Sequence, residues 1–293
     1  MQQAKAIFNK TRIAPTPSGF LHLGNALSFA ITAALAHKTG AKILLRIDDL
    51  DQARMRSEYV QDIFDTLNFL EISWHEGPRD MGDFNKHWSQ VQRLGLYNNA
   101  LNRLKQSNSI FACSCSRADI PESGIYPGTC LNKGLPLDTP NTSWRFKTDS
   151  NPIAVRTFPS GIVNSRLSPD MRYFIVRKRD GYPAYQLASL VDDLHFGIDL
   201  IIRGQDLWPS TLAQLQLANR LDENAFVNTN FYHHPLLMAD GNKKLSKSAG
   251  DTSIKYLIEQ GKNAADIYTM IAAHTGEEQR VNNWLELSHL LGS

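Results

Sequence analysis

The sequence is poor in cysteine, in long apolar runs and in net charge. Three cysteines among 293 residues, with no apolar signal region in the opening "MQQAKAIFNKTR", argue against a disulfide scaffold and favour metal binding, reactivity or core packing. The longest apolar-rich stretch, "ALSFAITAALA" at residues 26–36, is too short to span a bilayer. We therefore expect a soluble cytoplasmic protein without a membrane partner, and the sequence indicates no protein partner.

What the sequence does contain is typical of a globular chain. Apolar residues make up 42% and charged residues 20%, which predicts a packed core and excludes disorder or a fibrous repeat. A net charge of +2 neither supports nor excludes a nucleic-acid partner, because such proteins usually carry a clear basic excess or a basic face.

Alternating strand and helix patterns predict an α/β fold with a parallel sheet. Residues 6–14 and 41–47 have strand patterns, and between them a helical pattern at 25–40 ends at Gly40. Further helices are predicted at about 57–70 and 90–106. This strand, helix, strand order is the start of a parallel sheet.

The sequence pattern changes between about residues 110 and 182, where short strand-like segments alternate with Pro, Gly, Ser and Asn. The strand and helix alternation resumes after this stretch, so we interpret it as an insertion into the sheet domain. The predicted segments are a first half of the sheet domain at 1–109, an insertion at 110–182, a second half at 183–250 and a short helical tail at 251–293.

The stretch "RIAPTPSGFLHLGNA", residues 12–26, concentrates turn-forming residues between a predicted strand and a predicted helix. Such a turn lets the backbone approach a ligand closely, and the helix start presents N–H groups to an anion such as phosphate. His22 would then lie against that anion. A structural turn with a half-buried histidine is the alternative, because neither usual phosphate-loop pattern is present.

A second stretch, "DGNKKLSKSAG" at residues 240–250, places Lys243, Lys244 and Lys247 among Gly, Ser and Asn. It predicts a flexible basic loop, whose default interpretation is a solvated run of charge. Combined with His22, however, such a loop has the groups needed to surround a triphosphate and stabilise charge that grows on its α-phosphate.

These two stretches carry a resemblance to a known family. "HLGN" resembles the HIGH motif and "KLSKS" resembles the KMSKS motif of class I aminoacyl-tRNA synthetases. The resemblance to the glutamyl-tRNA synthetase group extends along nearly the whole chain. It is carried by the segments "RIAPTPSGFLHLG", "LLRIDDLD", "YPAYQLASLVDD" and "IIRGQDLWPSTLAQ". The resemblance implies a Rossmann-like catalytic domain that binds ATP with Mg²⁺ through His22, Gly24 and Lys247, with His22 and Lys247 as catalytic residues.

The same resemblance implies a glutamate site. Its residues would be Arg12, Ile13, Ala14, Pro15, Thr16, Asp48, Tyr185 and Arg203. The planar fork of arginine suits a carboxylate, although each arginine taken alone could equally form a surface ion pair. Asp48 stands where the family has a longer glutamate that binds the ammonium group, so a water can enter between the two.

All three cysteines fall in "CSCSRADIPESGIYPGTC", as Cys113, Cys115 and Cys130. They offer three sulfur ligands, and tetrahedral zinc needs a fourth. Spacing alone leaves zinc binding and plain core packing both open. The resemblance implies that Tyr126 is the fourth ligand of one Zn²⁺ per chain, and a cation beside the phenol favours its charged form. The role of the zinc would be structural, because four protein ligands leave no position open for substrate.

About 45 residues follow Lys247, too few for the anticodon-binding region of full-length glutamyl-tRNA synthetases. The chain therefore resembles their truncated paralogues, the glutamyl-queuosine tRNA(Asp) synthetases. That family activates L-glutamate with ATP without tRNA and transfers it to the queuosine base in the anticodon of tRNA(Asp). Here the basic residues Arg172, Arg177, Lys178 and Arg179 are expected to contact tRNA phosphates.

Three other interpretations remain open on the sequence. They are a truncated glutamyl-tRNA synthetase that charges a tRNA 3′ end, a non-catalytic tRNA-binding paralogue, and a more distant HIGH-type nucleotidyltransferase. The last predicts neither the zinc-bearing insertion nor the word "RIDDLD". His22 and Lys247 argue against the non-catalytic paralogue.

Overall fold

The computed structural model describes residues 7–239, 243–244 and 253–290 and divides the chain into two compact units. The first unit comprises Met1–Gln92, Leu200–Gln205 and His233–Ser293, and the second comprises Arg93–Asp199 and Asp206–Tyr232. Within the described ranges, no helix has both the length and the apolar character needed to cross a membrane. The four segments predicted from the sequence follow a different division and stay a prediction.

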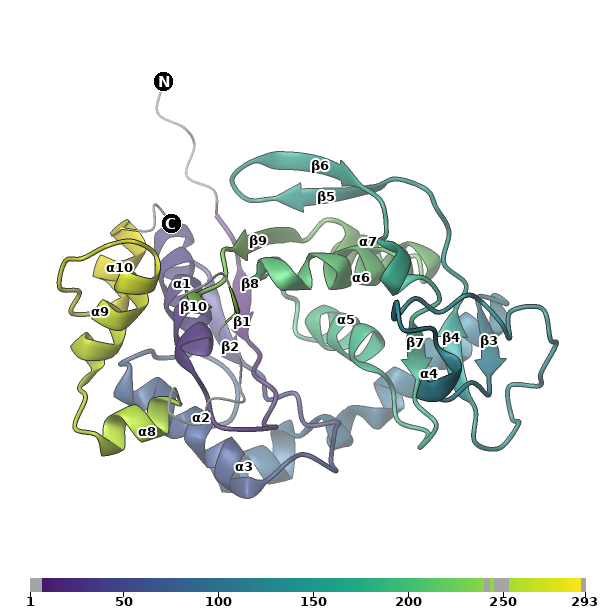
Figure 1. The fold of residues 1–293 in the computed structure, drawn as a ribbon, viewed down its shortest axis with the longest axis horizontal. Coiled ribbons are helices and arrows are strands. Elements are labelled where there is room, and N and C mark those ends of the chain that lie inside the picture. Colours follow the sequence, from purple (N-terminus) through teal and green to yellow (C-terminus); the bar gives the residue numbers. More distant parts are fainter. Residues whose placement is uncertain (1–6, 240–242, 245–252, 291–293) are drawn as a thin grey trace. The chain divides into compact units, whose positions relative to one another are not determined.

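The first unit is built on a strand, helix, strand crossover (Figure 1). Strand β1 (Lys10–Ile13) pairs in parallel with β2 (Lys42–Leu45), and helix α1 (Leu23–Thr39) connects them. Strand β8 (Leu200–Gly204) lies on the other side of β1. The sequence-based prediction of this crossover is confirmed, and it places the ends of β1 and β2 at one edge of the sheet.

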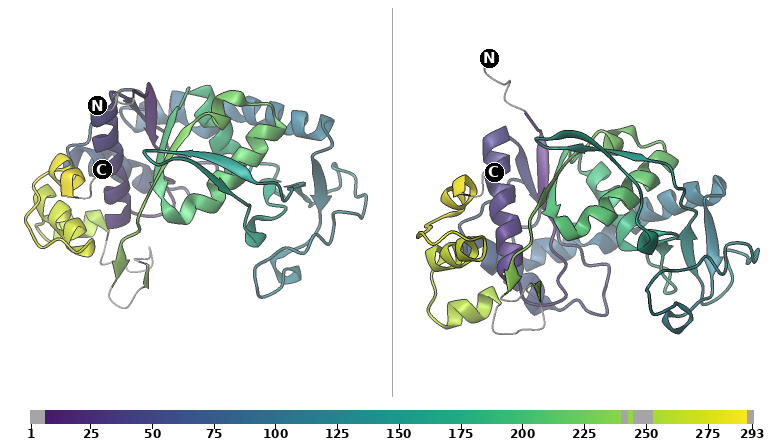
Figure 2. Two further views of the ribbon diagram at one scale, coloured as in Figure 1. Left: turned by 90° about the horizontal axis from the view of Figure 1, so that it is seen from above. Right: turned by 45° about the horizontal axis from the view of Figure 1, so that its top comes forward.

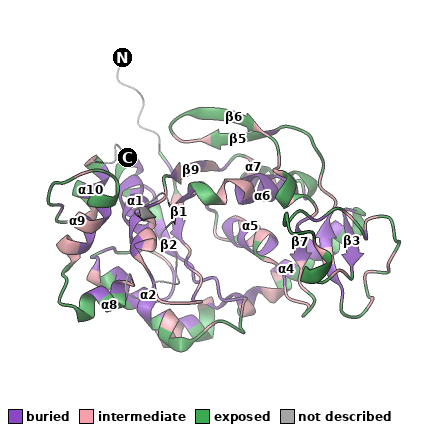
Figure 3. Ribbon diagram, in the orientation of Figure 1, coloured by how far each residue is buried: buried purple, intermediate pink, exposed green. Residues whose placement is uncertain are grey.

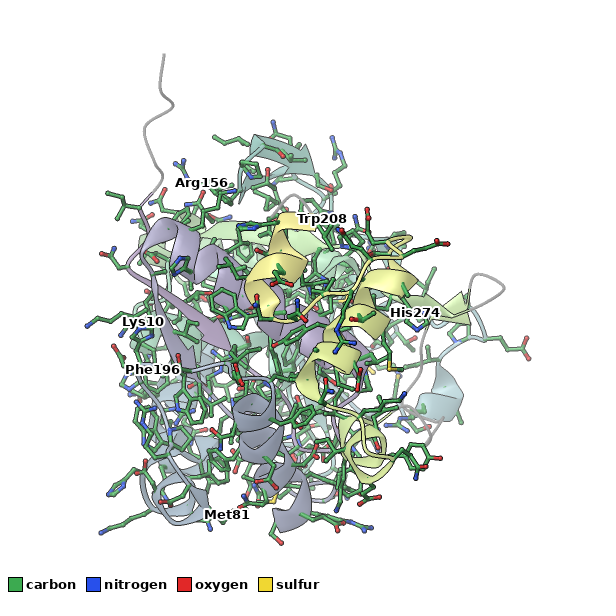
Figure 4. The ribbon with its side chains drawn as sticks, turned by 90° about the vertical axis from the view of Figure 1, so that its left-hand side faces the viewer. Lys10, Met81, Arg156, Phe196, Trp208 and His274 are labelled. Carbon is green, nitrogen blue, oxygen red and sulfur yellow. The ribbon has the colours of Figure 1, made fainter. Side chains whose placement is uncertain are left out.

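Helix α1 ends where the sequence predicts, because Gly40 adopts a left-handed conformation with φ of +83° and its N–H bonds to the carbonyl of Ala36. The helix contacts β1, β2 and β8 as well as the C-terminal helices α9 (Ala264–His274) and α10 (Trp284–Leu290). Figures 2 and 4 show α9 and α10 beside α1. This double cover explains why α1 is buried almost along its whole length (Figure 3).

The other elements of the first unit are short helices and one small strand pair. They are α2 (Ser57–Phe69), α3 (Met81–Asp83), the π-helix η1 (Phe84–Trp88), α8 (Ile254–Glu259), and β10 (Met238–Ala239) paired antiparallel with β11 (Lys243–Lys244). The 3₁₀ turn η2 (Gln90–Arg93) ends at the boundary of the second unit.

The second unit contains an antiparallel sheet, a hairpin and a group of helices. The sheet has the order β3 (Ile110–Cys113), β4 (Ser143–Phe146), β7 (Ile175–Arg177), and the hairpin joins β5 (Ile153–Thr157) to β6 (Gly161–Ser165). Strand β5 also pairs in parallel with the start of β9 (Asn230–His234). The helices are α4 (Leu94–Gln106), α5 (Tyr185–His195), α6 (Trp208–Arg220) and α7 (Asn224–Val227), with 3₁₀ turns η3 (Arg117–Asp119), η4 (Pro169–Met171) and η5 (Gln205–Leu207).

A buried ion pair fastens α4 to α5. Arg93 donates from Nε to Asp192 Oδ1 at 2.8 Å and from Nη2 to Oδ2 at 3.1 Å, and the Tyr97 hydroxyl donates to Asp192 Oδ1 at 2.7 Å. Asp192 is completely buried, so its charge is tolerated only because these three donors satisfy it.

The structure also tests the predicted element boundaries. Residues 110–182, all of which are described, contain short strands and 3₁₀ turns but no α-helix, as the sequence predicts. The helix predicted at 90–106 is a 3₁₀ turn at 90–93 followed by α4 from Leu94. Asp49 explains the irregular start, because its carboxylate accepts hydrogen bonds from the Ser89 hydroxyl at 2.6 Å and from the backbone N–H of Gln90 at 2.7 Å.

Candidate active site and candidate metal centre

Two buried guanidinium groups lie near one histidine in the first unit. Arg12 on β1 and Arg203 on β8 are both buried, and Arg12 donates from Nη1 to the backbone carbonyl of Ile202 at 3.2 Å. Burial, followed by the positive charges of Arg203, His234 and Arg12, lowers the pKa of His233 to about 3. His233 is therefore neutral at physiological pH, and the positive potential of the two arginines can attract a carboxylate.

The segment from Arg12 to Thr16 is tied to the end of β2. The Arg46 N–H donates to the carbonyl of Ile13, and the Asp48 N–H donates to the carbonyl of Pro15, both at 2.9 Å. The structure thus brings Arg12–Thr16, Asp48 and Arg203 into the same unit. Tyr185 lies in the second unit at the start of α5, with 42% of its surface exposed.

Asp48 has a partner that the sequence did not reveal. Arg46 donates to it from Nε at 2.7 Å and from Nη2 at 3.2 Å, and both side chains are buried. A carboxylate held by such a fork keeps further lone pairs for other donors. Contact between Asp48 and an ammonium group stays a prediction, and Arg46 now accounts for how the shorter side chain is oriented.

His22 caps the N-terminus of α1. Its Nδ1 accepts a hydrogen bond from the Gly24 N–H at 3.1 Å, and its own N–H donates to Asn25 Oδ1 at 3.1 Å. Because Nδ1 is the acceptor, the proton of the neutral ring lies on Nε2. A Cβ at position 24 would approach His22 Cε1 to 3.0 Å, so any larger residue would make a tight contact with the capping ring. A helix N-terminus and a ring N–H are both groups that can bind an anion.

Part of the predicted ATP site falls outside the described residues. Lys247 lies outside the described residues, and for Lys243 and Lys244 the structure describes only the backbone, as β11 paired with β10. Their roles, with those of His22 and Gly24 toward ATP, stay predictions.

The predicted metal ligands do lie together in the second unit. The Sγ atoms of Cys113, Cys115 and Cys130 are all within 4.8 Å of one another, and none is in a disulfide. The Cys113 Sγ is 3.3 Å from the Tyr126 hydroxyl, which also accepts a hydrogen bond from the Cys130 N–H at 2.9 Å. Tetrahedral zinc at its usual 2.3 Å from sulfur needs ligands about 3.8 Å apart. Three buried or half-buried thiols with an adjacent phenol therefore fit zinc.

The electrostatic surroundings of this cluster differ between its members. Burial opposes ionisation of Cys130, but a backbone hydrogen bond from Ser114 and side-chain bonds from Cys115 and Tyr126 outweigh it and lower the pKa of Cys130 to about 6. Burial and the hydrogen bond with Cys113 raise the pKa of the Tyr126 phenol. The guanidinium of Arg145, on β4, lies 3.8 Å from the centre of the Tyr126 ring. This buried cation can balance the negative charge that thiolate and phenolate ligands bring.

The four basic residues predicted to contact phosphates all belong to the second unit. Arg177 lies over the Trp144 ring at 4.7 Å and Arg172 over the Tyr173 ring at 5.3 Å. Lys178 pairs with Asp180 at 3.0 Å. Arg179 donates to the carbonyl of Ser114, between two of the cysteines, at 2.6 Å. Their contact with tRNA stays a prediction.

Comparison with known proteins identifies the sequence family. The sequence model of the family described as tRNA synthetases class I (E and Q), catalytic domain, matches residues 9–123 and 139–282. A Glutamyl-Q tRNA(Asp) synthetase of Synechococcus sp. (strain CC9605) is 33% identical over 292 residues, which cover 95% of this chain and 88% of that protein. A Glutamate--tRNA ligase 2 of Syntrophus aciditrophicus (strain SB) is 29% identical, and the match covers 86% of this chain but 54% of the ligase.

Solved structures confirm the fold. The glutamate-tRNA synthetase from Elizabethkingia anophelis superposes with a TM-score of 0.76 at 21% identity, covering 96% of this chain and 65% of that chain. A glutamate tRNA ligase from Elizabethkingia meningosepticum gives a TM-score of 0.69 at 23% identity, covering 85% of this chain and 53% of that one. The predicted α/β catalytic fold with a parallel sheet is confirmed. The chain belongs to the class I tRNA synthetases (E and Q) and, within them, to the glutamyl-Q tRNA(Asp) synthetase group.

Proposed function

We propose that this protein activates L-glutamate with ATP to glutamyl-adenylate without tRNA, and then transfers the glutamate to the queuosine base in the anticodon of tRNA(Asp). The observation that carries the first step is the pair of buried guanidiniums, Arg12 and Arg203, beside the neutral His233. The second step is supported by the names of relatives such as the Synechococcus protein, whose length the match covers to 88%.

Each residue has a distinct part in the activation step. Arg12 and Arg203 hold carboxylate oxygens of glutamate, and Asp48, oriented by Arg46, faces its ammonium group directly or through a water. A carboxylate oxygen attacks the α-phosphorus of ATP, the new O–P bond forms and pyrophosphate leaves. His22 donates its Nε2 proton in a hydrogen bond to the phosphate oxygens, and Lys247 supplies the second cation, where negative charge grows in the transition state.

The metal centre acts apart from this chemistry. Cys113, Cys115, Tyr126 and Cys130 would hold one Zn²⁺, which crosslinks a loop-rich segment of the second unit. Arg179 and its basic neighbours Arg172, Arg177 and Lys178 would bind tRNA phosphates irrespective of sequence, while the modified base supplies the specificity.

Exchange of labelled pyrophosphate into ATP tests the activation step. The proposal predicts exchange that requires glutamate, proceeds without any tRNA and is not supported by glutamine or aspartate. The likeness to a Glutamate--tRNA ligase 2 favours a second candidate, charging of a tRNA 3′ end. Exchange that appears only after tRNA(Glu) is added would favour that candidate and contradict activation without tRNA.

A further inference from the structure

A short antiparallel seam joins the turn that contains His22 to the start of α8, within the first unit. The Ile254 N–H donates to the carbonyl of Leu21 at 2.8 Å, and His22 pairs with Ser253 in an isolated antiparallel bridge. Next to them, Lys255 Nζ lies 4.6 Å from the centre of the Phe20 ring. Residues 20, 21 and 22 thus meet residues 255, 254 and 253 in order.

A carboxylate from α2 binds the centre of this seam. Asp62 Oδ2 accepts a hydrogen bond from the Leu21 N–H at 2.8 Å, and both residues are buried. Together with the bond from Ile254, this contact satisfies both backbone polar groups of Leu21. The backbone immediately before His22 is therefore held by two elements that are distant in the sequence, which fixes how the chain enters the N-cap of α1.

The carboxylate is an unfavourable choice if it serves stability alone. Burial raises the pKa of Asp62 to about 6, against the opposing effects of the Leu21 hydrogen bond and the charge of Lys255, while Asp65 on the same helix raises it further. Because the folded-state pKa lies above the unfolded value, the folded state binds the extra proton and Asp62 favours unfolding as pH rises from about 4 to 6. A buried charge that destabilises the fold near neutral pH is typical of functional positions.

We propose that Asp62 is a positioning residue for His22: by holding the Leu21 backbone, it sets both the geometry of the His22 cap and the docking of α8. This inference rests on the proposed function for its kinetic consequence but not for its structural one. It predicts that the negative acceptor at Asp62, and not merely a side chain of that size, keeps His22 in place for the transition state of activation.

The kinetic consequence is tested with the variants Asp62→Ala and Asp62→Asn. The matched control is Asp65→Ala, at an exposed position of α2. Asp62→Ala should lower kcat for glutamate-dependent pyrophosphate exchange about tenfold, the size expected for a hydrogen bond to a charged group, with little change in the KM values for ATP and glutamate. Asp62→Asn keeps the size and a neutral acceptor but loses the charge, so it should recover only part of the rate at pH 7. Asp65→Ala should match the unmodified protein.

The pH profile separates positioning from a purely structural role. The ratio of the unmodified protein's rate to that of Asp62→Asn should fall as pH drops through about 6, because Asp62 then gains its proton and loses its charge. Lys255 and Asp65 are the charged groups that influence this titration. A ratio that stays constant between pH 8 and 5 would contradict a role for the charged acceptor. So would an unchanged kcat in Asp62→Ala.

Hydrogen–deuterium exchange tests the structural consequence without substrate. In Asp62→Ala the amides in peptides that cover residues 20–23 and 253–256 should exchange faster, and in Asp65→Ala they should not. An unmodified protein that catalyses no pyrophosphate exchange would overturn the proposed function, whereas unchanged amide protection in Asp62→Ala would overturn the positioning role of Asp62.

Discussion

The two units place their polar groups by different means. In the first unit Arg12 and Arg203 lie on regular strands and Asp48 lies three residues after β2, where its backbone hydrogen bond to Pro15 fixes its position. Of the four candidate metal ligands in the second unit, Cys113 alone lies on a strand. The other three members of the cluster follow in a segment whose one regular element is the short turn η3.

This contrast indicates how each group depends on its surroundings. The first-unit residues of the candidate glutamate site are held by the sheet and its backbone hydrogen bonds, so their positions should tolerate loss of the metal. The loop-rich cluster has little backbone pairing, so its order should depend on the ion that links its side chains.

The largest effect is expected from Cys130→Ser. The purified protein should hold about one zinc per chain, and the variant should lose it because a three-ligand remnant binds zinc far more weakly. Chelator titration with elemental analysis measures this loss, and thermal unfolding should show a destabilised second unit. Ser114→Ala, beside Cys130 at 3.8 Å, is the control and should retain the metal. Zinc-free protein after purification without chelator would rule the site out.

A smaller effect, confined to the first unit, is expected from His22→Ala and Lys247→Ala. Either change should lower the rate of glutamate activation about a hundredfold or more, about 2.7 kcal/mol, because we propose that both groups act where charge develops. Zinc content should stay unchanged in both. His37→Ala, an exposed histidine on the same helix, should retain the original rate, and undiminished pyrophosphate exchange in the two variants would refute their assignment.

The smallest of these effects should come from Arg145→Met. Loss of the cation over the Tyr126 ring removes charge compensation from the metal ligands and should weaken zinc binding about tenfold. Arg145→Lys should recover part of this affinity, because it restores the charge without the planar stack. Arg172→Met, which removes a comparable stack on Tyr173, serves as the control. Equal zinc affinities in all three variants would show that Arg145 only packs against the tyrosine.

Local sequence signals predicted the features that depend on neighbouring residues. The end of α1 at Gly40 was predictable because a helix commonly ends at a left-handed residue, and glycine adopts that conformation most readily. The three cysteines and Tyr126 lie within eighteen residues of each other, and the structure brings them together. The order of β1, α1 and β2 follows from hydrophobic periodicity alone.

Contacts between distant segments could not be predicted in this way. His233 lies near Arg12 and Arg203 although more than 200 residues separate it from Arg12, and the pair "HH" at the end of β9 was the available signal. Asp62 reaches Leu21 across 41 positions, and it reads in the sequence as an ordinary polar residue of an amphipathic helix. Arg46 and Asp48 are only two residues apart, but the two hydrogen bonds between their side chains depend on the burial of both residues just after β2.

Transfer of labelled glutamate tests the central claim most directly. Queuosine-containing tRNA(Asp), the same tRNA without queuosine, and tRNA(Glu) are each incubated with the protein, ATP and labelled glutamate, and the 3′ end is then removed with nuclease. The account predicts label only on queuosine-containing tRNA(Asp), with the label retained after the 3′ end is removed. Label on the terminal adenosine of tRNA(Glu), released by the nuclease, would contradict it.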